Sequence, residues 1–281
     1  MTDLLALLPL LVALIGVLGL LIGSFLNVVI HRVPRGESVV SPPSSCPGCG
    51  ERIAAYDNVP VLSWLVLRAK CRRCGERISA RYPLVEAATG VAFAGVALVF
   101  LPPVLGAATT PDALAAIAQL LAFLVLAGSA VALAAIDLDT HRLPNPIVYS
   151  TGIAGLVLLA LAMLGDAQAG DLGRALAGAG ILFAFYLALA LARPGGMGLG
   201  DVKLAAVLGL YLGWVGWGAL AVGAFAAFLI GGIVGLLLIA VRRARRGTGI
   251  PFGPWMLAGA WIGIVAGEPL FTGYLGAVGL V

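Results

Sequence analysis

Long runs of apolar residues alternate with short polar breaks along most of this chain. A helix needs about 20 consecutive apolar residues to cross a bilayer core about 30 Å thick. Runs that are apolar on every side predict membrane helices, because strands of a membrane β-barrel alternate apolar and polar side chains. We predict about eight such helices, over residues 4–30, 84–105, 113–136, 147–164, 175–192, 202–219, 221–241 and 254–274. The division between the sixth and seventh rests only on Gly and Trp residues, because 214–238 carries no charge.

The composition strengthens this interpretation. Of 281 residues, 61% are hydrophobic and 11% are charged, against roughly 25% charged in an ordinary soluble domain. A soluble globular protein is therefore excluded, and an all-α polytopic membrane protein is predicted. The run 4–30 is too long for a signal peptide and has no basic start, so we expect it to stay as the first transmembrane helix.

The basic residues predict the orientation of the helices. Loops rich in Lys and Arg stay in the cytoplasm, and with eight helices only Arg174 lies on the opposite side. The net charge of +4 follows from this bias, so membrane lipid is the expected surrounding and no nucleic-acid partner is implied. The basic residues between the first two helices are Arg32, Arg35, Arg52, Arg68, Lys70, Arg72, Arg73, Arg77 and Arg81; those in later loops on the same side are Arg142, Arg193, Lys203, Arg242, Arg243, Arg245 and Arg246.

The four cysteines form two Cys-X-X-Cys pairs in the predicted cytoplasmic segment. They are Cys46, Cys49, Cys71 and Cys74. Two such turns can place four thiolates at the corners of a tetrahedron, and a glycine follows each pair, so a structural zinc site is predicted. Disulfides or a redox pair are alternatives that a reducing cytoplasm disfavours, and incidental cysteines are a third.

A segment of about fifty residues buries little core, and a bound metal would compensate for that. The chain is accordingly predicted to have three parts. They are a first transmembrane helix at 1–31, a cytoplasmic cysteine-rich zinc domain at 32–83 and a multi-helix transmembrane domain at 84–281.

Aspartates lie at two predicted membrane boundaries on the cytoplasmic side. Asp137 and Asp139 follow the third predicted helix, and Asp201 precedes the sixth. Ionisable groups are costly at this depth and are candidates for function, although an interfacial Asp can simply cap a helix. Glycines at 195, 196, 198 and 200 leave room for another backbone to approach Asp201.

Paired carboxylates can hydrolyse a peptide without a metal or a covalent nucleophile. One carboxylate is ionised and deprotonates water, while the other is protonated and polarises the scissile carbonyl group; two close carboxylates that share one proton meet both needs. The sequence shows neither a recognisable Ser-His-Asp pattern nor an HExxH helix. Spacing alone does not decide whether Asp137 or Asp139 pairs with Asp201.

Taken in order, these motifs give the chain a resemblance to the type IV prepilin peptidases from end to end. In that family's first catalytic motif an Asp lies seven residues before Pro-Asn or Pro-Asp, and Asp137 lies so before Pro144-Asn145; the second catalytic Asp ends a GxGD motif, here Asp201. The matching segments are Gly23-Ser-Phe-Leu-Asn-Val-Val-Ile-His-Arg-Val-Pro34, both cysteine pairs, Tyr56-Asp-Asn-Val-Pro60, Arg81-Tyr-Pro-Leu-Val-Glu86, the Asp137 segment, the GxGD segment and Ile250-Pro-Phe-Gly-Pro254.

The resemblance implies an enzyme of the bacterial inner membrane with its active site on the cytoplasmic face. It would cleave leaders from type IV prepilins or type II secretion pseudopilins, and would methylate the new amino terminus with S-adenosylmethionine. No residues are predicted to hold this cofactor. A GxGD intramembrane protease of other specificity is an alternative, as is a transporter with a cytoplasmic zinc module, although a transporter should carry its charges near the bilayer midplane.

Overall fold

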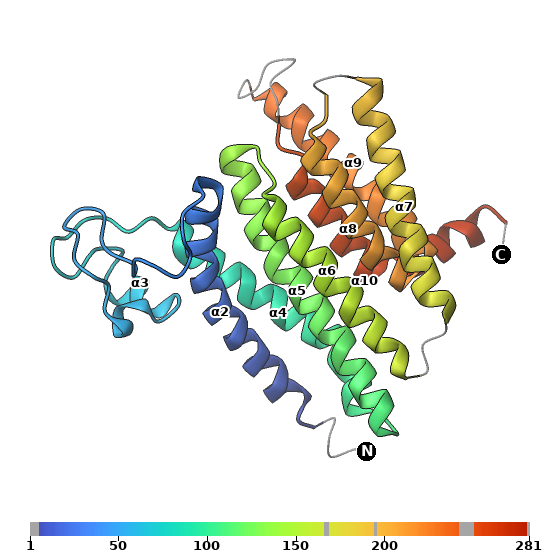
Figure 1. The fold of residues 1–281 in the computed structure, drawn as a ribbon, viewed down its shortest axis with the longest axis horizontal. Helices are drawn as coiled ribbons and strands as arrows, with labels where there is room; N and C mark the ends of the chain where they lie inside the picture. Colours follow the sequence, from blue (N-terminus) through green and yellow to red (C-terminus); the bar gives the residue numbers. More distant parts are fainter. Residues whose placement is uncertain (1–5, 166–168, 194–195, 242–249, 280–281) are drawn as a thin grey trace. The chain divides into compact units, whose positions relative to one another are not determined.

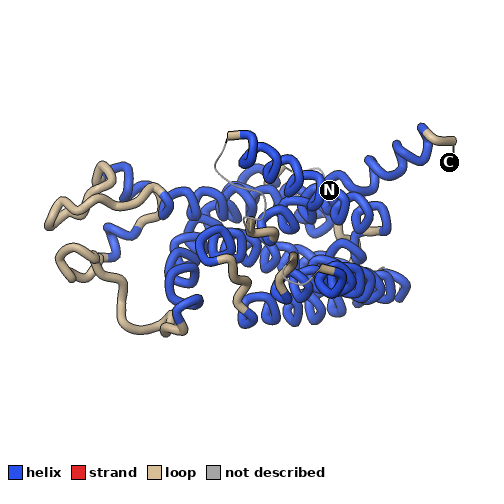
Figure 2. Tube along the Cα trace, turned by 90° about the horizontal axis from the view of Figure 1, so that it is seen from above, coloured by secondary structure: helices blue, strands red, loops and turns tan. Residues whose placement is uncertain are grey.

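The computed structural model describes residues 6–165, 169–193, 196–241 and 250–279. Figures 1 and 2 show helices joined by loops, and within these residues pairing of the β type is limited to two isolated bridges. The expected helix start at Leu4, Gly195 and the basic run Arg242 to Arg246 lie outside the described residues. The helices are α2 (Leu8–Arg32), η1 (Val33–Arg35), η2 (Ala55–Asn58), α3 (Leu62–Val66), α4 (Arg81–Leu105), α5 (Thr110–Thr140), α6 (Asn145–Leu161), η3 (Ala162–Leu164), α7 (Ala169–Ala192), α8 (Leu199–Val215), α9 (Trp217–Ala240) and α10 (Gly253–Ala277).

The predicted all-α membrane fold is confirmed. Each of the eight predicted spans corresponds to one long helix among the described residues, and seven of them are long and apolar enough to cross a membrane. The eighth, α8, has 17 residues and is about 26 Å long at 1.5 Å per residue. The chain forms two compact units, residues 1–136 and 137–281, which are described separately below.

In the first unit, α2 and α4 pack with their backbones almost in contact. A Cβ atom at Gly19 would lie 2.7 Å from the Cβ of Phe93, and one at Gly23 would lie 2.7 Å from the Cα of Glu86. Small residues permit this approach between membrane helices, where van der Waals packing replaces the hydrophobic effect. The side chain of Asn27 adds a polar contact by donating a hydrogen bond to the carbonyl of Tyr82 at 3.1 Å.

Helix α5 packs on α4 through aromatic rings, with Phe100 and Phe123 stacked at a centroid distance of 4.1 Å. Between α2 and α4 the chain is mostly loop, interrupted only by the short helices η1, η2 and α3 (Figure 2). This loop-rich segment holds all four cysteines. The predicted cysteine-rich loop segment between the first two long helices is therefore confirmed.

In the second unit, α8 is the central helix and contacts α6, α7, α9 and α10. It is buried on nearly every side from Val202 to Trp214, which explains why it is apolar all round. Gly178 on α7 and Gly209 on α8 leave no space for a side chain between these two helices. Against α6, the hydroxyl of Tyr211 donates a hydrogen bond to the carbonyl of Thr151 at 3.2 Å.

The division between α8 and α9 lies at Gly216, four residues before the predicted break at residue 220. Glu268 of α10 determines its position, because its Oε1 accepts hydrogen bonds from the backbone N–H groups of Gly218 at 2.9 Å and Ala219 at 3.2 Å. A carboxylate in this place satisfies N–H groups that the first turn of a helix leaves without partners. The sequence around the break is uniformly apolar and gave no sign of a partner fifty residues away.

Two other predicted boundaries were wrong, and both concern the aspartates. Helix α5 continues to Thr140, so Asp137 and Asp139 lie in its last turn instead of after it. Helix α8 begins at Leu199, so Asp201 lies in its first turn instead of before it. Apolar runs end where polar residues begin, but a helix continues as long as backbone hydrogen bonds and tertiary contacts support it.

Candidate functional site

Asp137 is a buried carboxylate at the C-terminal end of α5, with 4% of its surface exposed. Its Oδ2 accepts a hydrogen bond from the backbone N–H of Gly253 at 3.0 Å. Gly253 is the first residue of α10, so this donor is one that the helix itself cannot use. A Cβ atom at residue 253 would lie 2.8 Å from the same oxygen, and the contact therefore requires glycine.

Asp201 lies in the first turn of α8, where its Oδ2 accepts a hydrogen bond from the backbone N–H of Gly198 at 3.2 Å. Asp201 therefore helps to cap the start of α8, as the sequence allowed, but only one of its carboxylate oxygens is used for this. Asp201 is partly exposed, whereas Asp139 is exposed two residues beyond the buried Asp137. Residues i and i+2 point to different sides of a helix, so the burial favours Asp137 over Asp139.

The structure brings Asp137 and Asp201 together within the second unit. Their charges are close enough to interact. The side chain of Leu143 lies between Gly200 of α8 and Gly253 of α10, since a Cβ atom at either glycine would lie 3.2 Å from a Leu143 carbon. Glycines at both positions thus let the first turns of these two helices pack against the Leu143 side chain.

A second polar contact joins α6 to α8 beside Asp201. The Nζ of Lys203 donates a hydrogen bond to Oδ1 of Asn145 at 3.1 Å and lies 5.7 Å from the ring centroid of Tyr149. Asn145 is the first residue of α6 and Lys203 follows Asp201 by two residues. This contact fixes the start of α8, and therefore Asp201, relative to α6.

Aromatic side chains cover one side of this site. Tyr186 of α7 is buried and interacts electrostatically with Asp201. Its ring lies 5.5 Å from that of Phe228 on α9, and the ring of Phe252, just before Gly253, lies 5.1 Å from Phe228. An apolar wall next to carboxylates excludes water and strengthens electrostatic interactions at the site.

In the first unit, the thiols of Cys46, Cys49, Cys71 and Cys74 all lie within 4.8 Å of one another. The sulfur atoms of Cys46 and Cys74 are 3.7 Å apart. Tetrahedral zinc with Zn–S bonds of about 2.3 Å requires sulfur atoms roughly 3.8 Å apart, whereas a disulfide requires about 2.05 Å. The four thiols therefore fit a closed metal site with four cysteine ligands, and all four are free cysteines.

The two cysteine pairs adopt the same backbone turn. In each turn the first cysteine accepts a hydrogen bond from the following glycine, Gly50 at 2.8 Å and Gly75 at 3.0 Å. Both glycines have left-handed φ angles, 71° and 74°. The residues match as well, because Cys-Gly-Glu-Arg-Ile occurs at 49–53 and again at 74–78. This short repeat indicates two equivalent halves of one metal site.

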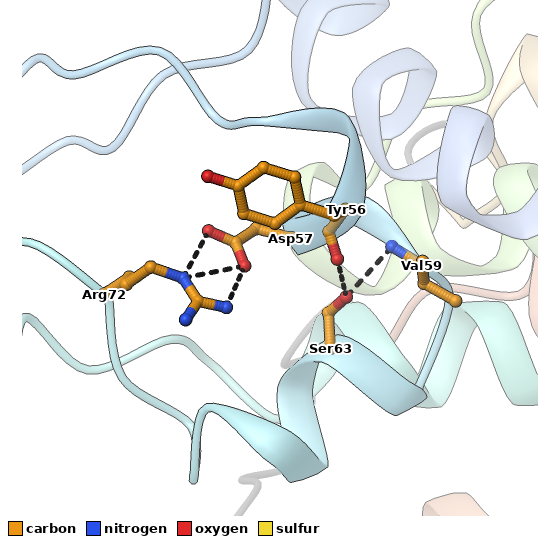
Figure 3. Close-up of polar contacts among 5 residues, drawn as sticks. All are labelled: Tyr56, Asp57, Val59, Ser63 and Arg72. Atoms are coloured by element: carbon orange, nitrogen blue, oxygen red, sulfur yellow. Dashed lines mark hydrogen bonds and ion pairs between the residues drawn. The ribbon is translucent and has the colours of Figure 1, made fainter.

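Side chains beyond the cysteines connect the second turn to the rest of the segment. Arg72 donates hydrogen bonds to both carboxylate oxygens of Asp57, the shortest at 2.6 Å, and its guanidinium lies over the ring of Tyr56 (Figure 3). These hydrogen bonds hold the pKa of Asp57 below its usual range. Backbone hydrogen bonds from Cys74 and Arg73 lower the pKa of the Cys71 thiol to about 7, which favours the thiolate that binds a metal.

Comparisons with known proteins show the family of this chain. A model of the bacterial peptidase A24 N-terminal domain matches residues 17–100, and a model of the type IV leader peptidase family matches residues 124–239. A curated protein of Aeromonas hydrophila is 38% identical, with 94% of this chain and 93% of the relative covered. The chain belongs to the type IV leader peptidase family.

Several curated relatives of this leader peptidase family carry the name prepilin leader peptidase/N-methyltransferase. Besides the Aeromonas hydrophila protein, they include one from Stutzerimonas stutzeri, 32% identical with 92% of each chain covered. Another is from Pseudomonas aeruginosa, 32% identical with 92% of this chain and 91% of the relative covered. No solved structure matches this chain.

Sequence reasoning missed the residues that hold the aspartates in place. Gly253 lies in a motif that was recognised, but nothing in the sequence pairs its N–H with a carboxylate 116 residues earlier. Lys203 was counted only as a topological charge. One feature of the sequence indicated that Lys203 could position Asp201. The lysine lies two residues after this candidate catalytic residue, near the start of a helix.

Proposed function

We propose that this chain is an aspartic endopeptidase that removes the leader peptide of type IV prepilins or type II secretion pseudopilins, with Asp137 and Asp201 as its catalytic pair. The observation that carries the proposal is the convergence of these two carboxylates at helix ends. Asp137 is buried against the N–H of Gly253, and Asp201 lies within electrostatic range of it. Membership of the leader peptidase family and the names of the curated relatives support the substrate class.

The chemistry follows from two carboxylates that share one proton. The ionised carboxylate accepts a proton from a water molecule, whose oxygen attacks the carbonyl carbon of the scissile peptide. The protonated carboxylate donates a hydrogen bond to the carbonyl oxygen and stabilises the charge that develops there. The C–N bond then breaks as a proton passes to the leaving nitrogen, and the pair returns to its starting protonation state.

The positions of the donors suit this role. Each carboxylate accepts one backbone N–H at one oxygen, which fixes its orientation and leaves the other oxygen for water or substrate. A substrate must approach as an extended strand, because a helix buries the peptide bond to be cut.

We further propose that this pair lies at the cytoplasmic face of the bacterial inner membrane, as the distribution of basic residues predicts. In this arrangement the three parts have separate tasks. Residues 1–31 anchor the chain, residues 32–83 form a domain stabilised by a structural zinc ion on the four cysteines, and residues 84–281 contain the peptidase. Zinc would complete the tetrahedron that the thiols outline and would take no part in cleavage.

The second proposed activity is methylation of the new amino terminus. The name of the curated relatives includes N-methyltransferase, and S-adenosylmethionine supplies the methyl group in such reactions. We assign no residues to its binding. The zinc domain is the proposed location of this activity, because the family resemblance connects methylation with this extended loop.

The test uses the purified full-length protein in detergent with a prepilin and with the same pilin lacking its leader. Wild type should release the leader from the prepilin only, as seen by mass spectrometry. Asp137→Ala and Asp201→Ala should each abolish release, whereas Asp139→Ala, which alters an exposed carboxylate, should cleave at close to the wild-type rate. Cleavage that survives either of the first two substitutions would exclude the proposed pair.

A further inference from the structure

The short helix α3 has one apolar face that no described residue covers. Leu62, Leu65 and Val66 are 60%, 57% and 75% exposed, and their spacing of i, i+3 and i+4 places them on one side of the helix. The other side is occupied. Ser63 contacts the backbone of Tyr56 and Val59 (Figure 3), and the indole N–H of Trp64 donates to the carbonyl of Ile78 at 3.1 Å.

A buried carboxylate fixes α3 to a transmembrane helix. Glu86, 8% exposed, accepts a hydrogen bond from the backbone N–H of Val61 at 2.7 Å. Val61 immediately precedes α3 and has a left-handed φ of 61°, a conformation that a β-branched residue adopts only when its surroundings require it. The position of α3 relative to α4 is therefore specified by a strong local contact.

This contact sets the depth of α3 in the membrane. Glu86 is the sixth residue of α4, about 7 Å along the helix from its start. In the same turn Leu84 is 66% exposed, and Val91 and Leu98 continue its face at seven-residue intervals. On a transmembrane helix such a face is in contact with lipid. The start of α3 at Val61 thus lies beside a turn of α4 whose apolar side chain, Leu84, is as exposed as a lipid-facing residue.

Basic residues follow α3 directly. Arg68 and Lys70 are exposed, and both lie within four residues of Val66. Apolar side chains at the acyl boundary next to cations at the headgroup level are the pattern of an interfacial membrane anchor. In Figure 1 the loop-rich segment extends sideways from the ends of α2 and α4, which is compatible with contact at the membrane surface.

We propose that α3 is a membrane-surface anchor for the cysteine-rich segment. Leu62, Leu65 and Val66 insert among the acyl chains of the surrounding bilayer, while Arg68 and Lys70 contact anionic lipid headgroups. The metal-binding turns are then held at the membrane surface by lipid in addition to the two chain connections. The anchor is independent of the aspartate pair, and its failure would leave the proposed peptidase unaffected.

The experiment places a fluorescent amino acid, dansylalanine, at Val66 of the full-length chain in phosphatidylethanolamine and phosphatidylglycerol nanodiscs. The matched control is the same label at Val40, which is also an exposed valine of this segment, 86% against 75%. Arg32, the last residue of α2, bonds to the carbonyls of Ser38 and Pro42, so the loop with Val40 lies beyond the helix end. Lipids with brominated acyl chains quench only labels that they touch.

Brominated lipid should remove most of the emission at Val66 and little of it at Val40. Equal quenching of the two labels by brominated lipid would overturn the proposal. The proposal would also be overturned if brominated lipid did not quench the Val66 label but addition of a prepilin changed its emission. The apolar face of α3 would then be a surface that binds substrate.

A second pair of variants tests the contact with α4. With the label at Val66, Glu86→Ala should reduce the quenching, and Glu86→Gln, which keeps an acceptor for the Val61 N–H, should retain it. One zinc ion per chain in both variants would show that the segment is still folded. Full quenching in Glu86→Ala would refute the role of Glu86 in setting the depth.

Discussion

The cysteine site and the aspartate site are built in opposite ways. The four thiols come from two turns within 29 residues, and each turn is closed by its own glycine. The aspartate pair joins residues 64 positions apart, and the partner that holds Asp137 is 116 residues away. The first site is a local structure that a bound metal would stabilise, whereas the second is produced by the packing of helix ends.

This difference determines which changes should disrupt each site. The cysteine segment has little buried core, since Cys46 and Pro60 are its only buried residues between Val33 and Ala80, all of which are described. With so small a core, the proposed metal and a few polar contacts would have to supply its stability. Asp201 lies on α8, which is buried along most of its length, and Asp137 is held by the backbone N–H of Gly253, so the aspartate site depends on small separations between helix ends. Metal removal should affect one region and loss of a glycine the other.

Removal of the metal should have the largest effect on structure. Structural zinc in small domains contributes apparent free energies of about 10–16 kcal/mol, so Cys71→Ser should unfold the segment locally. Elemental analysis should give one zinc per chain for wild type and none for the variant. Hydrogen exchange should lose protection between residues 46 and 78 and keep it in α7 to α10.

The activities should separate in the same variant. Methylation should fall much more than prepilin cleavage, because the aspartates belong to the other compact unit. Cleavage that disappears while methylation persists would reverse the assignment of the two activities, and reduced wild type without zinc would reject the metal site.

Gly253→Ala should have the next largest effect, on cleavage alone. The new methyl group would lie 2.8 Å from Oδ2 of Asp137, and a catalytic group displaced by about 1 Å can cost roughly 10²-fold in rate. The matched control is Gly273→Ala in the same helix, where a Cβ atom meets nothing within 4 Å. Steady-state kinetics should show a lower kcat for the first variant only. An equal loss of kcat in both variants would contradict this, because it would show that any glycine-to-alanine change in α10 lowers activity.

Lys203→Met should lower kcat/KM about tenfold, which is 1.4 kcal/mol and falls near the range for hydrogen bonds to charged groups. The expected cause is displacement of Asp201 when the contact with Asn145 is lost. Asn145→Leu should give a similar loss, and the double variant should lose little more, because both remove one interaction. Fully additive losses would show that Lys203 acts without Asn145.

The smallest effect should come from Asp57→Asn, which weakens the contact with Arg72. Exposed ion pairs contribute up to about 1 kcal/mol, so a chelator should remove zinc at most roughly fivefold faster. Because Arg72 lowers the pKa of Asp57, the contribution is present above the unfolded value of about 4 and is lost only as the pH falls through the lower folded value. The difference should be constant near neutral pH.

The sequence predicted the helices well because apolar length alone decides whether a segment can cross a bilayer. The predicted helix ends were wrong because apolar length does not show where a helix stops. The predicted third helix stopped at Ile136, before the charge of Asp137, although the backbone remains helical to Thr140. The break at Gly216 was missed because Glu268, its capping partner, lies in another helix.

The sequence by itself determined that this chain is a helical membrane protein, and it contained the complete ligand set of the cysteine cluster. Both are consequences of neighbouring residues, through apolar length in one case and two matching turns in the other. Only the tertiary structure decided that Asp137 is buried and Asp139 exposed, that Gly253 donates to Asp137, and that α3 is fixed beside α4 by Glu86. These contacts depend on which helices pack together and how closely. The spacing of residues within one segment does not predict contacts between residues that are distant in the sequence.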